Sequence, residues 1–168
     1  HSYFIKNQSK DQKIINQALQ LEKEAFSCAD MGIVTSSWQR DTIIKQYNIK
    51  PEKIRVIPNF VVTNVFEPRP EIQKNYDLIF VGRNGSQKNL RNLIKAIQHL
   101  KTKNKIISLL MVGGCSSVNE IKELKNQYKL DITFKGNVPN YDLPYILNQS
   151  RVFILPSYYE GHPKALLE

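Results

Sequence analysis

Two glutamates near the end of the chain stand where a polar ligand could bind. Glu160 and Glu168 are eight positions apart and follow the apolar run 152–155. Pro156 ends that run, and Pro163 suits the first turn of a helix. Glu160 therefore falls on a strand-to-helix turn, which is where open α/β sheets bind their ligands. The residue types and their order predict a ligand-binding turn.

The spacing of the two glutamates limits the chemistry that they could perform. If a helix begins near His162, the pair would be separated by roughly 12 Å along the axis, at about 1.5 Å per residue. The carboxyl groups of a retaining glycosidase stand only about 5 to 5.5 Å apart. We therefore interpret Glu160 and Glu168 as two hydrogen-bond acceptors that hold separate parts of one elongated, hydroxyl-rich ligand.

A turn with two glycines and two cations forms a second candidate site. Gly82 and Arg83 follow an apolar run, and Lys88 stands just before the next predicted helix. Free backbone amides, the helix dipole and two cations together suit a phosphate or diphosphate. The spacing from Gly82 to Gly85 fits neither the dinucleotide fingerprint nor the P-loop. The alternative, that Arg83 and Lys88 are ordinary solvated loop cations, stays open.

Two further turns follow predicted strands and would lie at the same sheet edge. Gly113 and Gly114 lack side chains and would let a ligand approach the backbone. The turn 136–139 contains Asn137 and Val138, which could contact a flat heterocycle or form only a turn. Four loops are thus expected to converge on one edge.

Strands alternate with helices in the second part of the chain. We expect strands at 78–81, 109–112, 132–134 and 152–155, and helices at 89–100, 118–128 and 141–148. Each strand is an unbroken apolar run, which is typical of a parallel sheet covered by helices on both faces. The predicted fold class is therefore α/β.

The first part of the chain has fewer elements. We expect a helix at 9–29, a strand at 31–35, a helix through 38–47 capped by Ser36 or Ser37, and a strand at 54–57. Pro68 and Pro70 interrupt a stretch of mixed charge that has no period. The sequence predicts a first region at 1–60, a connector at 61–76 and a second region at 77–168.

Composition restricts the partners. The net charge of +9 favours an anionic partner, although lysines on solvated helix faces would explain it equally well. Basic residues are not interleaved with stacking aromatic residues, which argues against a nucleic-acid-binding domain. Cys28 and Cys115 have no metal-ligand spacing, so a reduced, cytoplasmic setting is expected. The sequence contains no run of about 18 apolar residues, so no membrane-spanning helix is expected.

Several of these motifs, taken in order, resemble the retaining glycosyltransferases of family 4, which have the GT-B fold. The resemblance rests on Gly82-Arg83 followed by Lys88-Asn89, on Pro156-Ser157, and on the complete Glu-x7-Glu pattern from Glu160 to Glu168. It extends from about Phe26 onward. It implies a Rossmann-like donor lobe, incomplete at its end, preceded by the tail of an acceptor lobe.

The resemblance also implies a role for each matching residue. Arg83 and Lys88 would bind the diphosphate of a nucleotide sugar such as a UDP-sugar, with Gly82 in the same turn. Glu160 would hold hydroxyls of the transferred sugar, and Glu168 would bind the ribose. The segment Gly161, His162, Pro163 and Lys164 would assist through its free backbone N–H groups, and Asn137 and Val138 would contact the base. His1 would correspond to an acceptor-lobe histidine.

The implied reaction transfers a hexose with retention of configuration, as in polysaccharide biosynthesis. Cations and amides aimed at the departing diphosphate lower the barrier, with Glu160, Arg83 and Lys88 as the catalytic group. No metal or cofactor is expected. The acceptor would be a glycan or a lipid, with peripheral contact to an anionic membrane at the inner face as an option.

Two expectations concern the extent of the chain and its activity. The chain begins at His1 and ends at Glu168 inside a predicted helix, so we expect a fragment that does not turn over by itself. The alternative function is a non-catalytic regulator of the same fold that binds a nucleotide or a phosphosugar. The donor sugar, nucleobase, acceptor, linkage and oligomeric state are left open by the sequence.

Overall fold

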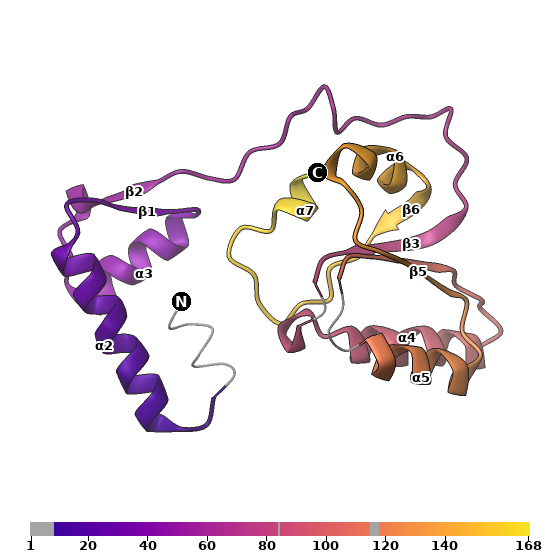
Figure 1. Cartoon of the computed structure of the whole chain (residues 1–168), viewed down its shortest axis with the longest axis horizontal. Coiled ribbons are helices and arrows are strands. Elements are labelled where there is room, and N and C mark those ends of the chain that lie inside the picture. Colours follow the sequence, from indigo (N-terminus) through magenta and orange to yellow (C-terminus); the bar gives the residue numbers. More distant parts are fainter. Residues whose placement is uncertain (1–8, 84, 115–117) are drawn as a thin grey trace. The chain divides into compact units, whose positions relative to one another are not determined.

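The computed structural model describes residues 9–83, 85–114 and 118–168 (Figure 1). The chain divides into two compact units, one at residues 1–59 and the other at residues 60–168. The described elements are confined within these units, and the predicted connector at 61–76 falls in the second unit. Each unit has a hydrophobic core of its own.

The first unit has two helices and a small parallel sheet. Its elements are α2 (Gln12–Cys28), β1 (Gly32–Val34), α3 (Ser37–Tyr47), the 3₁₀ turn η1 (Pro51–Lys53) and β2 (Ile54–Val56). The strands pair in parallel, from Gly32 opposite Ile54 to Val34 opposite Val56. The predicted helices and strands are all present, and the core is Val34, Tyr47, Ile49 and Ile54.

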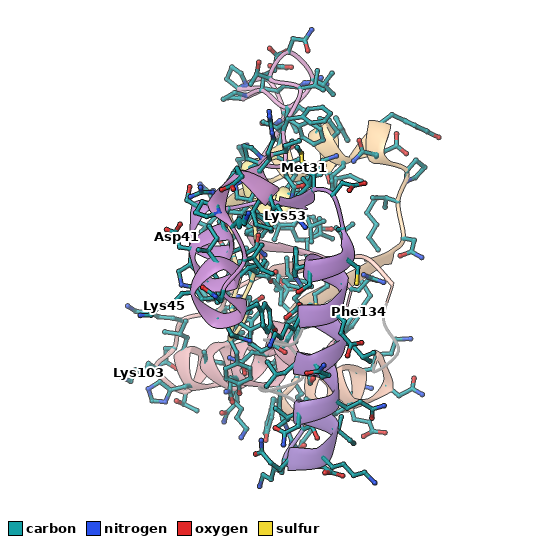
Figure 2. The ribbon with its side chains drawn as sticks, turned by 90° about the vertical axis from the view of Figure 1, so that its left-hand side faces the viewer. Met31, Asp41, Lys45, Lys53, Lys103 and Phe134 are labelled. Carbon is teal, nitrogen blue, oxygen red and sulfur yellow. The ribbon has the colours of Figure 1, made fainter. Side chains whose placement is uncertain are left out.

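Side chains fix the ends of both helices in this unit. Asp11 accepts a hydrogen bond from the Lys13 amide at 2.8 Å, and Ser36, one of the two predicted caps, accepts from the Gln39 amide. At the other end of α2, the Nζ of Lys53, a residue labelled in Figure 2, donates to the carbonyls of Ser27 and Ala29. A cation at a helix C-terminus complements the helix dipole, so this contact holds α2 against the turn before β2.

The second unit is built on a four-stranded parallel sheet. Its strands are β3 (Tyr76–Val81), β4 (Leu109–Val112), β5 (Ile132–Gly136) and β6 (Ser150–Phe153). The spatial order is β5-β4-β3-β6, and each neighbouring pair is parallel. The helical elements are η2 (Ser86–Lys88), α4 (Leu90–Thr102), α5 (Val118–Tyr128), η3 (Asn140–Asp142), α6 (Leu143–Asn148) and α7 (Lys164–Leu167).

Helices cover both faces of this sheet, as predicted. Phe80 on β3 packs with Ile94 and Ile121 from α4 and α5, whereas Ile79, the preceding residue, packs with Ile146 from α6. Successive side chains of a strand point to opposite faces, so the unbroken apolar runs supply both cores. Figure 1 shows α4 and α5 on one side of the sheet and α6 on the other. The predicted α/β class is confirmed.

The predicted connector is partly packed on the second unit. Residues 57–75 contain no helix or strand. The side chain of Phe66 packs against the core beneath α6, and Asn148 bonds the backbone on both sides of Pro68, at Glu67 and Arg69. These contacts explain why the compact unit begins at Phe60 rather than after the connector.

Several predicted boundaries differ from the structure, and two of them bear on the site. β6 is Ser150–Phe153, whereas a strand at 152–155 was expected. It is an edge strand that begins with the polar residues Ser150 and Arg151, and Ser150 pairs with Tyr76 of β3. The expected terminal helix is only α7, with residues 161–163 outside it. Apolar composition alone marks neither the polar start of an edge strand nor the length of a solvent-facing helix.

Asp77 joins the starts of three strands. Its Oδ2 accepts hydrogen bonds from the Ser108 amide and hydroxyl, each at 2.9 Å, and Arg151 Nε lies 3.7 Å from Oδ1. The Ser108 backbone bond is the largest cause of a lowered pKa for Asp77, followed by the Ser108 hydroxyl, with Arg151 also lowering it. The ionised carboxylate therefore stabilises the edge of the sheet opposite the strand carboxyl ends.

Candidate functional site

The four loops that follow the strands meet at one edge of the sheet. Because all four strands are parallel, the segments after Val81, Val112, Gly136 and Phe153 leave from the same edge. A pocket of about 710 Å³ lies among them. Its lining residues are Arg83, Gly85, Gln87, Lys88, Gly114, Asn137 and Glu160. The structure thus brings together four residues that the sequence predicted for one ligand.

Opposite charges meet inside this pocket. Lys88 Nζ lies 2.6 Å from Glu160 Oε1, and both side chains are largely buried, with exposures of 17% and 18%. Ser157 Oγ donates to the same oxygen at 2.6 Å. Charge-assisted hydrogen bonds of this kind are roughly twice as strong as neutral ones. Glu160 is therefore held in place by two donors.

Arg83 adds a second positive charge to the pocket. It follows Gly82 at the end of β3 and is exposed, so its guanidinium is accessible to solvent. Lys88 is the last residue of the short η2 turn, and both Arg83 and Lys88 line the pocket. A planar guanidinium and an ammonium facing one cavity are suited to a diphosphate.

Glycines after β4 allow the neighbouring loops to approach closely. Gly113 has φ +124, and a Cβ there would lie 2.2 Å from the Gly82 carbonyl oxygen. A Cβ on Gly114 would lie 2.9 Å from Asn137 Oδ1. At both glycines the atoms that come close belong to the protein, and the approach of a ligand to the backbone here stays a prediction.

Glu168 is not brought to the pocket. Its side chain is 5% exposed, 3.6 Å from Lys164 Nζ, and it lines a separate cavity of about 370 Å³ with Phe66 and Arg151. Helix α7 begins only at Lys164 and has four residues, so Glu160 is not on it. The expectation that both carboxylates face one cleft is therefore wrong for this structure.

The remaining predicted residues lie outside the pocket lining. Val138 packs against the core beneath α6, so its side chain is structural here. Gly82 lines a neighbouring cavity of about 330 Å³ with Phe80 and Phe134. Lys164 Nζ lies 6.0 Å from the ring centroid of Phe60. Gly161 is exposed, whereas His162 and Pro163 are half-buried.

Some predicted residues lie outside the described residues, and some residues at the site were not predicted. His1, Asn84 and Cys115 are not among the residues that the structure describes. Gln87 and Ser157 were not predicted, although a hydroxyl three residues before Glu160 on a turn could have indicated the bond to Glu160.

Within the described ranges, no group of three or more His, Cys, Asp or Glu residues could hold a metal ion. None of the described helices is long and apolar enough to span a membrane.

The family of the chain is decided by two adjoining matches. The family described as glycosyl transferases group 1 matches residues 62–168, and glycosyltransferase family 4 matches residues 1–65. The chain belongs to the group 1 glycosyl transferases. The matched stretch contains the whole pocket, so the family assignment and the site concern the same part of the chain.

Curated relatives of this glycosyl transferase chain are sugar transferases. It is 31% identical, over 88% of its length and 42% of the relative's, to an Escherichia coli UDP-Gal:alpha-D-GlcNAc-diphosphoundecaprenol alpha-1,3-galactosyltransferase. It is 27% identical to the E. coli O-antigen chain mannosyltransferase B, over 86% of its length and 42% of the relative's. The chain therefore spans less than half of these relatives.

Solved structures confirm the fold. Sucrose-phosphate synthase from Thermosynechococcus elongatus has a TM-score of 0.74 at 23% identity, covering 94% of this chain and 43% of that one. TarM of S. aureus, in a complex that contains UDP, has a TM-score of 0.74 at 19% identity, covering 89% and 29%. Anabaena HepE with UDP-glucose has a TM-score of 0.69 at 17% identity, covering 85% and 43%. The GT-B-type fold predicted from the motifs is confirmed.

Proposed function

We propose that the protein of this chain transfers a hexose from a nucleoside diphosphate sugar to a glycan, lipid or other acceptor, with retention of configuration. One observation carries the proposal. Arg83 and Lys88, on the loop after β3, share a pocket with Glu160, on the loop after β6. Cations beside a carboxylate at the carboxyl edge of a parallel sheet match the two chemical parts of such a donor, its diphosphate and its sugar hydroxyls.

The cations would act on the leaving group. Cleavage of the bond between the anomeric carbon and the diphosphate oxygen leaves the electron pair on that oxygen. Lys88 and Arg83 would stabilise this charge as it develops, which lowers the barrier without a metal ion. The acceptor hydroxyl would then attack the same face of the sugar and pass its proton to the departing phosphate. We therefore propose a metal-independent, front-face transfer.

Glu160 would orient the sugar. Both hydrogen bonds that it receives from the described residues go to Oε1, from Lys88 and from Ser157. Oε2 would then accept from hydroxyl groups of the hexose. Asn137, which also lines the pocket, would contact the nucleotide base. The donor would thus lie with its diphosphate beside the η2 turn and its sugar beside the loop after β6.

The names of similar proteins suggest the first donors to test. UDP occurs in a TarM complex, UDP-glucose in a HepE complex, and UDP-Gal in the name of the galactosyltransferase. We propose a UDP-hexose as the first candidate donor and a cytoplasmic site of action. The net charge of +9 supports peripheral contact with an anionic membrane if the acceptor is lipid-linked. Liposome co-sedimentation that is indifferent to lipid charge would contradict the membrane contact.

A thermal-shift panel tests the function. UDP, GDP, ADP and their hexose esters are each added to the chain and to Arg83→Ala. Stabilisation by one nucleotide series, reduced in Arg83→Ala, is the expected result; equal shifts in both proteins would contradict the assignment. Transfer by the full-length protein separates the enzyme from the alternative regulator, which would bind the nucleotide and transfer nothing.

The ribose contact implied for Glu168 remains a prediction. The buried position of its carboxylate beside Lys164 does not place it at the pocket. Glu168→Ala tests it directly. Weaker binding of the nucleoside diphosphate would support the contact, and unchanged binding would make Glu168 a structural residue.

A further inference from the structure

Asn89 occupies an unusual backbone position next to the pocket. It directly follows Lys88 and has φ 56 and ψ 32, in the left-handed region that favours glycine and asparagine. It is also the N-cap of α4, where an asparagine side chain commonly accepts a bond from the first turn of the helix. Here the side chain makes no capping bond. Nδ2 donates instead to the carbonyl of Pro156, at 3.1 Å.

Two more hydrogen bonds join the same two segments. The Tyr158 amide donates to the Gln87 carbonyl at 2.9 Å, and Asn92 Nδ2 donates to the Tyr158 hydroxyl at 3.2 Å. The loop after β6 is therefore fastened to the η2 turn and the start of α4 on both sides of Ser157. Glu160 follows Tyr158 by two residues, and its carboxylate forms the ion pair with Lys88.

We propose that Asn89 is a positioning residue for sugar binding, an inference that rests on the proposed function. Its carboxamide fixes the loop after β6 to the end of the phosphate-binding turn, and this sets where the Glu160 carboxylate meets the hexose. Glycine would adopt the same backbone conformation but has no donor. Aspartate tolerates the conformation but has an oxygen in place of Nδ2. Asparagine alone among these three supplies both properties.

The role predicts a selective defect. The diphosphate would contact Lys88 and Arg83, whose turn keeps its backbone conformation in Asn89→Gly. The sugar would depend on Glu160, whose loop loses the bond at Pro156. Affinity for the hexose ester should therefore fall about three- to tenfold, which corresponds to one net hydrogen bond. Affinity for the nucleoside diphosphate alone should change less than about twofold on the same scale.

Calorimetric titration of the full chain measures both affinities. UDP, GDP and ADP are titrated first, and the nucleotide that binds the wild type is then compared with its hexose ester. Asn104→Gly is the matched control, because Asn104 has φ 58 and lies in the loop after α4. Amide exchange of Tyr158 should accelerate in Asn89→Gly and not in the control. Asn89→Asp should show the same selective loss and provides the test if the glycine variant does not fold.

Each result has one reading. A loss confined to the hexose ester in Asn89→Gly, with Asn104→Gly like the wild type, supports the positioning role. Equal losses for both ligands, or no loss for either, overturn it while leaving the proposed function in place. If the wild type binds none of the three nucleotides, the proposed function itself fails, and this inference fails with it.

Discussion

The ion pair between Lys88 and Glu160 can be tested by a double-mutant cycle in the absence of any ligand. Lys88→Met and Glu160→Gln each remove one charge with little change in shape. The atoms are 2.6 Å apart, and the two side chains are 17% and 18% exposed, so solvent screens the pair only partly. A hydrogen bond to a charged group contributes about 1.5–3 kcal/mol. We expect each single change to lower the free energy of unfolding by about that amount.

The coupling energy isolates the contact itself. The double variant should be more stable than the sum of the single changes predicts by about 1–2 kcal/mol, within the range found for contacting pairs. Arg91 and Glu120 form the control pair: their atoms are 3.2 Å apart, but the side chains are 66% and 47% exposed. An exposed pair of this kind should give a coupling of about 0.2–1 kcal/mol or less.

Urea unfolding of the four proteins in each cycle gives both coupling energies. Strictly additive effects of Lys88→Met and Glu160→Gln would contradict this prediction, because they would mean that the two charges do not interact. So would a coupling no larger than that of the exposed control pair.

Two further predictions concern the sheet that carries the site. Gly113→Ala should destabilise the protein by about 2 kcal/mol or more, because Cβ would meet the Gly82 carbonyl and φ is +124. Thermal unfolding measures the loss, and Gly85→Ala is the control, because the space at its Cβ is open. Equal losses of stability in the two variants would contradict the packing argument. The pKa of Asp77 is lower in the folded protein than its unfolded value of about 3.9, so the ionised carboxylate stabilises the fold above that unfolded pKa. This stability is lost as the pH falls through the folded pKa. The stability gap between the wild type and Asp77→Asn should therefore stay constant above about pH 5 and narrow as the pH falls below it. A gap that does not change below about pH 5 in urea titrations would contradict this.

The sequence predicted the elements with strong internal patterns. Helix α4 shows its buried stripe in Leu90, Leu93, Ile94 and Ile97, and β4 is an unbroken apolar run buried from Leu109 to Val112. Apolar stripes and unbroken apolar runs indicate which side chains are buried when helices cover the sheet. The convergence of loops at one edge followed because all the strands are parallel.

The contacts inside the site could not be predicted in the same way. The bond from Asn89 to Pro156 spans 67 residues and depends on a left-handed backbone position that composition does not reveal. Ser157 joins Glu160 only because the loop after β6 bends back on itself. The predicted position of Glu168 in the same cleft as Glu160 was wrong because the estimated separation assumed a helix that begins near His162, whereas α7 begins at Lys164. Loop geometry depends on tertiary contacts, which a local pattern does not contain.

We propose that Arg83, Lys88 and Glu160 bind the two parts of one nucleotide sugar in the pocket of about 710 Å³. Calorimetric titration of the nucleoside diphosphate and its hexose ester into the wild type, Lys88→Met and Glu160→Gln tests it most directly. Arg91→Ala, which removes a cation on α4 outside the pocket lining, controls for net charge. We expect Lys88→Met to weaken the binding of both ligands, and Glu160→Gln to weaken the binding of the hexose ester only. Wild-type affinity of Lys88→Met for both ligands would contradict it.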